Sequence, residues 1–560
     1  MGAIWLLHLC GGLALAAAGW LVPRHIARAR RSTTASLLLD IAPFALGAGL
    51  LALATGRPVF AGLVILALGA GFALADHAMR ETLHEPVVFS EMSELPQVFT
   101  HPHLYLPFAG PGLVIGGAAG AVALGLALLL LEPPVWTPQP GLGLIAVALI
   151  IATGWLMACE PLLGIAAAGM RRLAPTGEPF ADVKRLGPFA MLLAHTVIAR
   201  AERSARQSTL CAPTRHSGAP RSGEPVIHIP EADVDGFQAP SLRSGPGMTE
   251  GGVPLILVQC ESFFDARRLS PSLPRNLLPG FDTCCQSAAL SGRLEVPGWG
   301  ANTMRTEFAV LTGIPESELG YDRFNPYYAL ARVPIASQIW RLRQAGYRTI
   351  CLHPFDRRFF RRDLAMPALG FEEFLGRETL GGSRVPPYYP DPDLARDILR
   401  TLDSHGPRTC IFAITMANHG PWLEKGPSID PAIAGLFDPA AVPQGDALLR
   451  YLDGLRRSDE MLQVLMEGIQ QRRSPAVLGF YGDHLPSLPQ AYAHFGFDEP
   501  HSDYAIWPGE AGIPTRRCDL PAHRLGAVIV DALLGAEAPA GALERAGDPT
   551  LDLGACLAGR

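Results

Sequence analysis

The chain has 560 residues and a formal net charge of −6, with 49% hydrophobic and 18% charged residues. This length predicts several domains, and the modest negative charge with scattered basic residues argues against a nucleic-acid-binding protein. The ten cysteines are dispersed and form no Cys-x-x-Cys pair, which argues against a zinc ribbon or a thioredoxin-like site.

Apolar residues are concentrated in the first third of the chain. Buried helices of a soluble protein would also be apolar, but five long runs in succession favour a multi-span membrane domain, which we place at residues 1–200. The runs are long enough or nearly long enough to cross a bilayer, and they cover residues 4–22, 36–55, 58–75, 106–131 and 142–163.

Charges flanking the first run bear on its orientation. No Lys or Arg precedes the run and the basic cluster at residues 24–31 follows it, which is not typical of a signal peptide. The positive-inside rule places that cluster in the cytoplasm. A C-terminal domain outside the cytoplasm then needs one more crossing, for which residues 187–199 are the candidate. They are short for a span and could instead form an interfacial helix, so the number of spans stays open.

The second half of the chain has the pattern of an α/β domain. Residues 201–252 are rich in Pro, Gly, Ser and Arg, which predicts a linker. Helical patterns then alternate with short apolar runs, so we predict a mostly parallel sheet within a domain at residues 253–540, followed by a tail at 541–560. The predicted buried strands are residues 253–260, 348–352, 409–415 and 476–481. The predicted helices include residues 336–346 and the amphipathic stretch 446–470, with Asp446 as its N-cap.

Polar residues follow each predicted strand, at the edge where open α/β sheets bind ligands. Glu261 follows the first strand, His353 the second, and the sequence Asn-His-Gly-Pro with His419 the third. Asp483 and His484 follow the fourth. Each of these residues alone is often structural, but their common location is more specific. A carboxylate beside a neutral imidazole suits Mn²⁺ or Zn²⁺ as a ligand pair.

Two further stretches are suited to an anionic group. Residues 300–308 read as a loop running into a helix, with Thr303 near the helix start. Free backbone N–H groups and the positive end of the helix dipole would hold a phosphate or sulfate there, although threonine is also a common N-cap. Residues 354–363 place four arginines beside aromatic residues, which favours an anion cradle, with an exposed basic loop as the alternative.

Together these residues resemble the alkaline phosphatase/sulfatase superfamily, and within it the lipoteichoic acid synthase and phosphoglycerol transferase family. The resemblance covers the whole chain and implies an α-helical transmembrane N-terminal part followed by an extracytoplasmic, sulfatase-like α/β catalytic domain. The family's nucleophile is a threonine followed, at a fixed spacing, by Ser/Thr-Glu-Phe. Thr303, followed by Thr306-Glu307-Phe308, matches that motif.

The resemblance also implies roles for individual residues. One divalent metal ion, with Mn²⁺ preferred and Mg²⁺ or Zn²⁺ as alternatives, would be held by Glu261, Thr303, Asp483 and His484. Substrate would be bound by His353, Phe360, Arg362 and His419.

This chain departs from the family around the residues that would contact the headgroup of the lipid donor. Lipoteichoic members usually carry Trp-Asn-Arg where this chain has Phe360-Arg361-Arg362. An acid expected two residues after His353 is Phe355, with Asp356 next to it. These differences point to a different headgroup chemistry or a different acceptor.

The implied activity is a transferase of the cell membrane with its catalytic domain outside the cytoplasm. It would move a phosphoglycerol group from phosphatidylglycerol, through a covalent glycerophospho-threonine, to an envelope glycan or a polyglycerolphosphate acceptor. The Ala/Arg/Gly-rich composition fits a high-GC Gram-negative source and favours a periplasmic glucan or other envelope glycan. We expect no nucleic-acid partner.

Three rival functions share parts of this pattern. A sulfatase would need Cys or Ser in a Cys-x-Pro-x-Arg-like motif, whereas Met-Arg-Thr follow Thr303. A phosphoethanolamine transferase shares fold, threonine and metal, but its Glu-Thr-Ala-Arg-like signature is not seen. A non-catalytic membrane scaffold would not need a nucleophile and metal ligands together.

Overall fold

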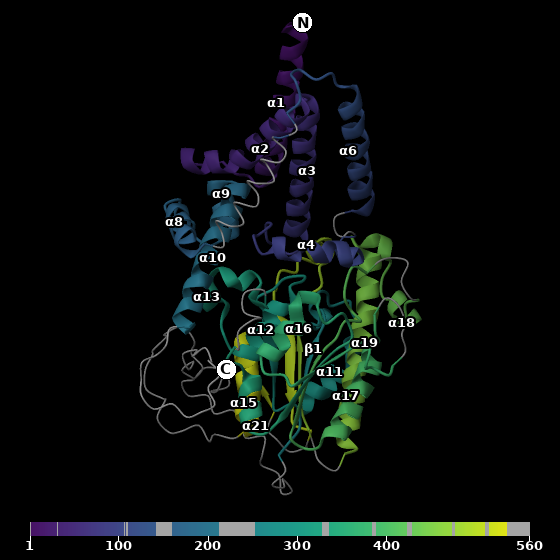
Figure 1. The fold of residues 1–560 in the computed structure, drawn as a ribbon. Coiled ribbons are helices and arrows are strands. Elements are labelled where there is room, and N and C mark those ends of the chain that lie inside the picture. The colour runs from purple at the N-terminus through teal and green to yellow at the C-terminus, as the bar shows by residue number, and fades with distance from the viewer. Residues whose placement is uncertain are drawn as a thin grey trace, which may run out of the picture. The chain divides into compact units, whose positions relative to one another are not determined.

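The structure of the protein is a computed structural model. It describes residues 2–30, 32–105, 107, 110–139, 141, 159–211, 252–327, 335–382, 388–422, 428–472, 476–509 and 515–534. The chain divides into two compact units (Figure 1). The first comprises Met1–Ser217 and Gly320–Phe324, and the second comprises Gly218–Leu319 and Asn325–Arg560.

The first unit is helical. Its described helices are α1 (Gly2–Ile26), α2 (Thr34–Thr55), α3 (Pro58–Thr82), α4 (Glu91–Thr100), α5 (Pro102–Tyr105), α6 (Pro111–Leu131), α8 (Glu160–Arg171), α9 (Pro179–Leu186) and α10 (Pro188–Cys211). Among the described residues, four stretches are long and apolar enough to cross a membrane: Trp5–Ile26, Thr34–Thr55, Pro58–Thr82 and Gly112–Leu131. They coincide with the first four predicted runs, as expected of a membrane-anchored protein.

The last two membrane predictions have different outcomes. Most of the fifth predicted run, residues 142–158, lies outside the described residues. Residues 188–199 of the candidate crossing 187–199 form the first half of α10, a helix that is long enough to cross a membrane but is not among the helices apolar enough to do so. α10 carries charged residues along its second half, and this lowers its average hydropathy.

A buried carboxylate joins the start of α10 to the apolar helices. Asp40 of α2 accepts hydrogen bonds from Arg24 Nη1 at 2.6 Å and from Trp20 Nε1 at 2.9 Å. It also accepts from the backbone N–H groups of Phe189 at 2.8 Å and Ala190 at 3.1 Å. A buried charge is costly unless it is paired in this way. Asp40 therefore fixes where α10 begins.

A short segment from the second half of the sequence also packs in the first unit. It is the 3₁₀ helix η3 (Gly320–Phe324). Arg203 Nε donates to Asp322 at 2.6 Å, and the rings of Phe324 and Phe89 are 6.3 Å apart. At this segment the chain returns to the first unit from within the sequence of the second unit.

The second unit is built on a nine-stranded mixed sheet with the order β4-β3-β5-β1-β6-β7-β2-β8, in which β9 also pairs with β2. The strands are β1 (Leu255–Cys260), β2 (Leu290–Glu295), β3 (Arg348–His353), β4 (Glu373–Gly376), β5 (Thr409–Ile414), β6 (Val477–Gly482), β7 (Ser502–Trp507), β8 (Arg516–Arg517) and β9 (Leu520–Pro521). The five neighbouring strands β4, β3, β5, β1 and β6 are parallel to one another, and only β7 runs antiparallel to its neighbours β6 and β2. The predicted mostly parallel sheet is confirmed.

Helices cover both faces of this sheet. They are α11 (Pro279–Ser287), α12 (Thr303–Thr312), α13 (Glu316–Leu319), α15 (Gln338–Gln344), α16 (Arg362–Ala368), α17 (Asp391–His405), α18 (Pro431–Ala434), α19 (Gly445–Gln470), α20 (Pro489–Phe495) and α21 (Ala522–Leu534). The short 3₁₀ helices are η1 (Ala266–Arg268), η2 (Arg275–Leu277), η4 (Phe359–Arg361) and η5 (Pro439–Ala441). The predicted N-cap of α19 is wrong, because Gln444 holds that position and Asp446 lies in the first turn. There its charge still favours the helix dipole.

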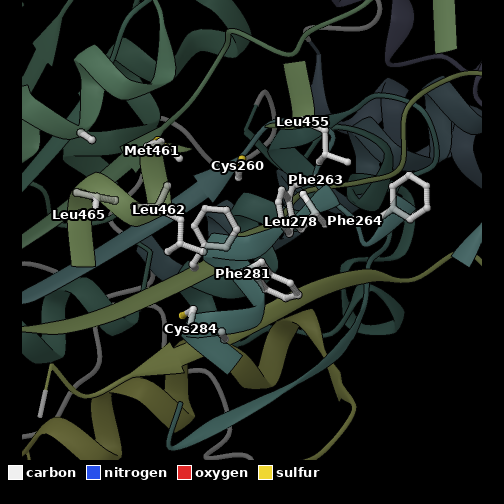
Figure 2. Close-up of a cluster of buried hydrophobic side chains, with 14 of the residues drawn as sticks. Cys260, Phe263, Phe264, Leu278, Phe281, Cys284, Leu455, Met461, Leu462 and Leu465 are labelled. Atoms are coloured by element: carbon white, nitrogen blue, oxygen red, sulfur yellow. The ribbon is translucent and has the colours of Figure 1, made fainter. Parts of the chain in front are cut away.

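The two faces of the sheet bury two separate hydrophobic cores. Because strand side chains alternate between faces, Ile256, Val258 and Cys260 of β1 face one core while Leu255 and Leu257 face the other. The first core contains buried residues of α11 and α19 (Figure 2). The second contains buried residues of α12, α15 and α21. By the same alternation Gln259 lies on the α12 side, where the candidate site is found.

Candidate active site

Four neighbouring parallel strands end at one edge of the sheet. In the order β3, β5, β1 and β6, their carboxyl ends carry His353, Thr415, Glu261 and Asp483. Thr415 Oγ1 accepts the backbone N–H of Glu261 at 2.9 Å, which ties two of these ends together. The ends of parallel strands are where open α/β sheets bind ligands. The predicted site residues after these strands are therefore neighbours in space.

Three of the predicted metal ligands form one buried group. Ligand atoms of Glu261, Asp483 and His484 all lie within 4.8 Å of one another. His484 Nε2 is 3.6 Å from Glu261 Oε1, 3.3 Å from Asp483 Oδ2 and 3.4 Å from Thr303 Oγ1. The structure thus brings all four predicted ligands around one point.

The hydrogen bonds of the group leave lone pairs directed at that point. His484 Nδ1 donates to Leu485 O at 2.9 Å, so Nε2 carries the free lone pair. Asp483 Oδ1 accepts the N–H groups of Ser262 and His484, at 2.8 and 2.9 Å. Asp483 Oδ2 is buried and has no hydrogen-bond partner within the described part of the chain. A buried acceptor without a partner is costly, and a cation would satisfy it.

The charge balance of the group also fits a cation. Burial and the adjacent Asp483 carboxylate raise the pKa of Glu261 to about 8. Two buried carboxylates therefore resist ionising together unless a positive charge compensates them. Two carboxylates, an imidazole nitrogen and a hydroxyl are donors that suit Mn²⁺ or Zn²⁺. The residues present fit one divalent ion.

Thr303 is the first residue of α12 and is buried. The alternative that it caps the helix does not hold, because Asn302 occupies the N-cap position and Thr303 lies one residue inside. The first turn of α12 is bonded to the segment after β6 that carries Asp483 and His484, since Thr306 Oγ1 donates to Asp483 O at 2.6 Å. The hydroxyl of Thr303 is thereby held beside His484 and is free of a capping role.

The backbone beside several site residues is left-handed. Ser262, Asn302, Phe360 and Arg361 have φ values between 55° and 66°, a region that non-glycine residues seldom occupy. Such conformations persist only when the surrounding structure holds them, and they gather at functional sites. Phe360 and Arg361 are consecutive and together turn the chain into α16, whose first residue is Arg362.

Arg362 is buried in an ion pair. Its Nε lies 3.0 Å from Glu307 Oε1 and its Nη2 lies 2.9 Å from Glu307 Oε2. Its remaining terminal nitrogen, Nη1, is 3.3 Å from His353 Nε2. The guanidinium carbon also lies 5.3 Å from the centroid of the Phe360 ring. Three of the predicted substrate-binding residues, His353, Phe360 and Arg362, therefore form one cluster.

Burial lowers the pKa of both predicted substrate-binding histidines, His353 and His419, which favours their neutral forms. Burial, and then the nearby Arg362 charge, lower the pKa of His353 well below its usual value. Its Nδ1 donates to Ile414 O at 3.3 Å, which leaves Nε2 as the acceptor facing Arg362. Burial also lowers the pKa of His419, whose Nδ1 donates to Gly420 O at 2.6 Å. The His419 Nε2 is thus an acceptor.

The four-arginine cradle predicted at residues 354–363 is only partly formed. Arg357 pairs with Glu378 at 2.9 Å and Arg358 pairs with Asp356 at 2.8 Å. Both arginine side chains are largely exposed to solvent. Only Arg362 of the four arginines is buried at the site. The exposed-loop alternative therefore describes Arg357 and Arg358.

Several residues near the site were not singled out from the sequence. Glu307 entered only as a letter of the nucleophile motif, and its partners Gln259 and Tyr327 were not considered at all. Tyr388 was also missed, although its ring lies 5.8 Å from that of His419. One available signal was Gln259 itself, a polar residue inside an otherwise apolar strand two positions before Glu261.

Comparison with known proteins gives three main findings. Residues 255–507 match the Sulfatase family model. The chain is 29% identical over 463 residues to the Capsular polysaccharide biosynthesis protein RkpI of Rhizobium meliloti (strain 1021), a match covering 81% of this chain and 78% of that protein. It is 29% identical over 285 residues to a second protein of the same strain, named provisionally a cyclic beta-1,2-glucan modification protein. That match covers 49% of this chain and 43% of that protein.

Solved structures also align with this chain. The Streptococcus pyogenes phosphoglycerol transferase GacH, in complex with sn-glycerol-1-phosphate, is 22% identical with a TM-score of 0.38. The alignment covers 50% of this chain and 74% of that chain.

Proposed function

We propose that this chain, whose residues 255–507 form a sulfatase-like domain, is a membrane-anchored phosphoglycerol transferase. Its donor is phosphatidylglycerol, and its acceptor is an envelope glycan or a glycerophosphate chain. The observation that carries the proposal is the position of Thr303. Its hydroxyl lies at the start of a buried helix, 3.4 Å from His484 and beside two buried carboxylates. A covalent phosphotransferase needs a nucleophile in that setting.

The reaction proceeds in two displacements at phosphorus. In the first, Thr303 Oγ1 bonds to phosphorus, the bond from phosphorus to the diacylglycerol oxygen breaks, and diacylglycerol leaves with a proton. In the second, an acceptor hydroxyl bonds to phosphorus and the bond to Thr303 breaks, which returns the threonine hydroxyl. A divalent cation bound by Glu261, Thr303, Asp483 and His484 would lower the pKa of the Thr303 hydroxyl and offset phosphoryl charge.

Other residues of the site orient the transferred group. The neutral His419 has an acceptor nitrogen for a hydroxyl proton of the glycerol or of the acceptor. Arg362 supplies N–H donors for the phosphate. Thr303 is also the first residue of α12, where the positive end of the helix dipole favours a negatively charged phosphate.

The cluster formed by His353, Phe360, Arg362 and Glu307, called here the headgroup cluster, favours a neutral polyol over an ammonium group. The Arg362 charge is compensated by Glu307, and His353 is neutral. The face of Phe360 lies against the Arg362 guanidinium. An ammonium headgroup would need a carboxylate or an open aromatic face, and within these four residues both are already engaged. This favours glycerol over ethanolamine, the rival donor headgroup.

The names of two relatives support a glycan acceptor. One refers to capsular polysaccharide biosynthesis and the other, provisionally, to modification of a cyclic glucan. A polysaccharide and a glucan both present hydroxyl groups of the kind that the second displacement needs.

Donor choice can be tested with the purified full-length protein in detergent and Mn²⁺. We expect diacylglycerol release from phosphatidylglycerol to exceed release from phosphatidylethanolamine by more than roughly tenfold, because polar recognition rejects a mismatched group strongly. Headgroup-labelled lipids and chromatography of the products measure this. Equal release from both lipids, or faster release from phosphatidylethanolamine, would refute the phosphoglycerol assignment and leave the ethanolamine rival.

The orientation in the membrane is a second part of the proposal. A phospholipid donor favours a catalytic domain outside the cytoplasm. The basic cluster at residues 24–31, placed in the cytoplasm, agrees with that orientation if the chain crosses the membrane an even number of times, as the four described apolar stretches would give. Alkaline phosphatase fused after residue 560 should therefore be active, and a fluorescent protein that folds only in the cytoplasm should be dark. The reverse pattern would place the domain inside the cell.

A further inference from the structure

Glu307 lies beneath the nucleophile on the same helix. It follows Thr303 by four residues in α12, so the two side chains share one helix face. Glu307 is fully buried, and both of its oxygens are saturated. Oε1 accepts from Arg362 Nε at 3.0 Å and from Tyr327 Oη at 2.7 Å. Oε2 accepts from Arg362 Nη2 at 2.9 Å and from Gln259 Nε2 at 3.0 Å.

The partners of Glu307 belong to a tier of polar residues just below the metal ligands. Gln259 and Tyr481 are register partners on β1 and β6, and Tyr481 Oη donates to Gln259 Oε1 at 2.7 Å. Each precedes a predicted metal ligand, Glu261 or Asp483, by two residues and so lies on the same face of its strand. Glu307 is therefore bonded directly to β1, through Gln259, and indirectly to β6, through the bond from Tyr481 to Gln259.

This arrangement decides which edge of Arg362 is available. Glu307 occupies the edge formed by Nε and Nη2 with two parallel hydrogen bonds, which fixes the plane of the guanidinium. Nη1 extends beyond that fork to His353, whose other nitrogen is bonded to the backbone of Ile414. Nη1 and Nη2 each keep one N–H group that is bonded neither to Glu307 nor to His353, and the charge of the arginine is compensated by Glu307.

We propose that Glu307 is a positioning residue for the donor headgroup, acting through Arg362. It orients the free N–H groups of Arg362 toward the phosphate and keeps the headgroup cluster electrically neutral. This inference rests on the proposed phosphoglycerol transfer, because it assigns Arg362 to the donor. Glu307 itself does not touch the reacting atoms.

Glu307→Gln tests the proposal with little change in shape. A neutral amide cannot accept both arginine bonds, so the fork is lost while Thr303 and the metal ligands remain in place. We expect the KM for phosphatidylglycerol to rise roughly tenfold or more, with a much smaller change in kcat, since a charge-assisted contact to the donor is lost. The metal content should equal that of wild type. Glu318→Gln, an exposed substitution on α13, is the matched control.

A double-variant cycle separates positioning from a general loss of stability. If Glu307 acts through Arg362, Glu307→Gln should leave KM unchanged when added to Arg362→Ala. A rise in KM of the same size in both backgrounds, or an unchanged or lower KM in Glu307→Gln alone, would overturn the proposal.

A binding measurement distinguishes this proposal from the proposed function. Titration calorimetry of the full-length protein with sn-glycerol-1-phosphate, the phosphate and headgroup of the proposed donor, needs no turnover. We expect binding to wild type and to Glu318→Gln, and at least roughly tenfold weaker binding to Glu307→Gln. If wild type releases no diacylglycerol but binds the probe with this pattern, the transfer reaction fails and the positioning role stands. Equal binding by Glu307→Gln, or no binding by wild type, contradicts the positioning role.

Discussion

Thr303→Ala should lower the rate of diacylglycerol release from phosphatidylglycerol by roughly 10⁴-fold or more, the scale expected when a covalent nucleophile is removed. The substitution deletes the hydroxyl that lies 3.4 Å from His484 and also one of the four predicted metal donors. The fold should persist, because the helix N-cap position belongs to Asn302 and the deleted group makes no capping bond.

Thr303→Ser is the matched control for this variant. It keeps the hydroxyl and loses only a methyl group, so it should retain measurable turnover while alanine does not. Thermal unfolding of both variants should stay close to wild type. Diacylglycerol release that proceeds undiminished in Thr303→Ala would show that Thr303 is not the nucleophile.

Asp483→Ala combined with His484→Ala should abolish metal binding, and with it activity. The two side chains supply half of the predicted donor set, and Asp483 Oδ2 is the buried acceptor that has no hydrogen-bond partner among the described residues. Wild-type protein purified with Mn²⁺ should contain about one ion per chain, since one such group of buried ligands is present in the described part of the chain. Elemental analysis measures the content directly.

The matched control for the metal experiment is Asp498→Ala combined with His494→Ala. These are the same residue types at exposed positions nearby in the chain, and they should leave the metal content unchanged. A chelator should lower the melting temperature of wild type but not that of the Asp483/His484 variant, because ligand binding stabilises only the state that binds it. Equal metal content in wild type and the Asp483/His484 variant would contradict the site.

The central strands could be predicted because burial on both faces makes them continuously apolar. β1, β5 and β6 are buried at every residue, and their sequences contain almost no polar letters. β2 went unnoticed because its sequence, Leu-Ser-Gly-Arg-Leu-Glu, mixes polar and apolar residues, and β4 because it has only four residues. Such strands are held by their neighbours in the sheet, and a local pattern does not reveal them.

The metal group could be predicted for a related reason, since each polar ligand follows an apolar strand and parallel strands end together. The pairing of Glu307 with Arg362 could not, because the two residues are 55 positions apart and lie on separate helices. Likewise, the sequence did not indicate that both nitrogens of His353, a predicted substrate-binding residue, have partners within the protein, Ile414 and Arg362. Such pairings depend on tertiary contacts that periodicity does not encode.

The central claim is that Thr303 carries the transferred group, and mass spectrometry tests it most directly. Full-length enzyme is mixed with phosphatidylglycerol and Mn²⁺ in the absence of an acceptor, quenched in acid and digested. The account predicts a glycerophosphate adduct on the peptide that contains Thr303, and no adduct in Thr303→Ala. Active enzyme that stays unmodified under these conditions, or an adduct on any other residue, would contradict it.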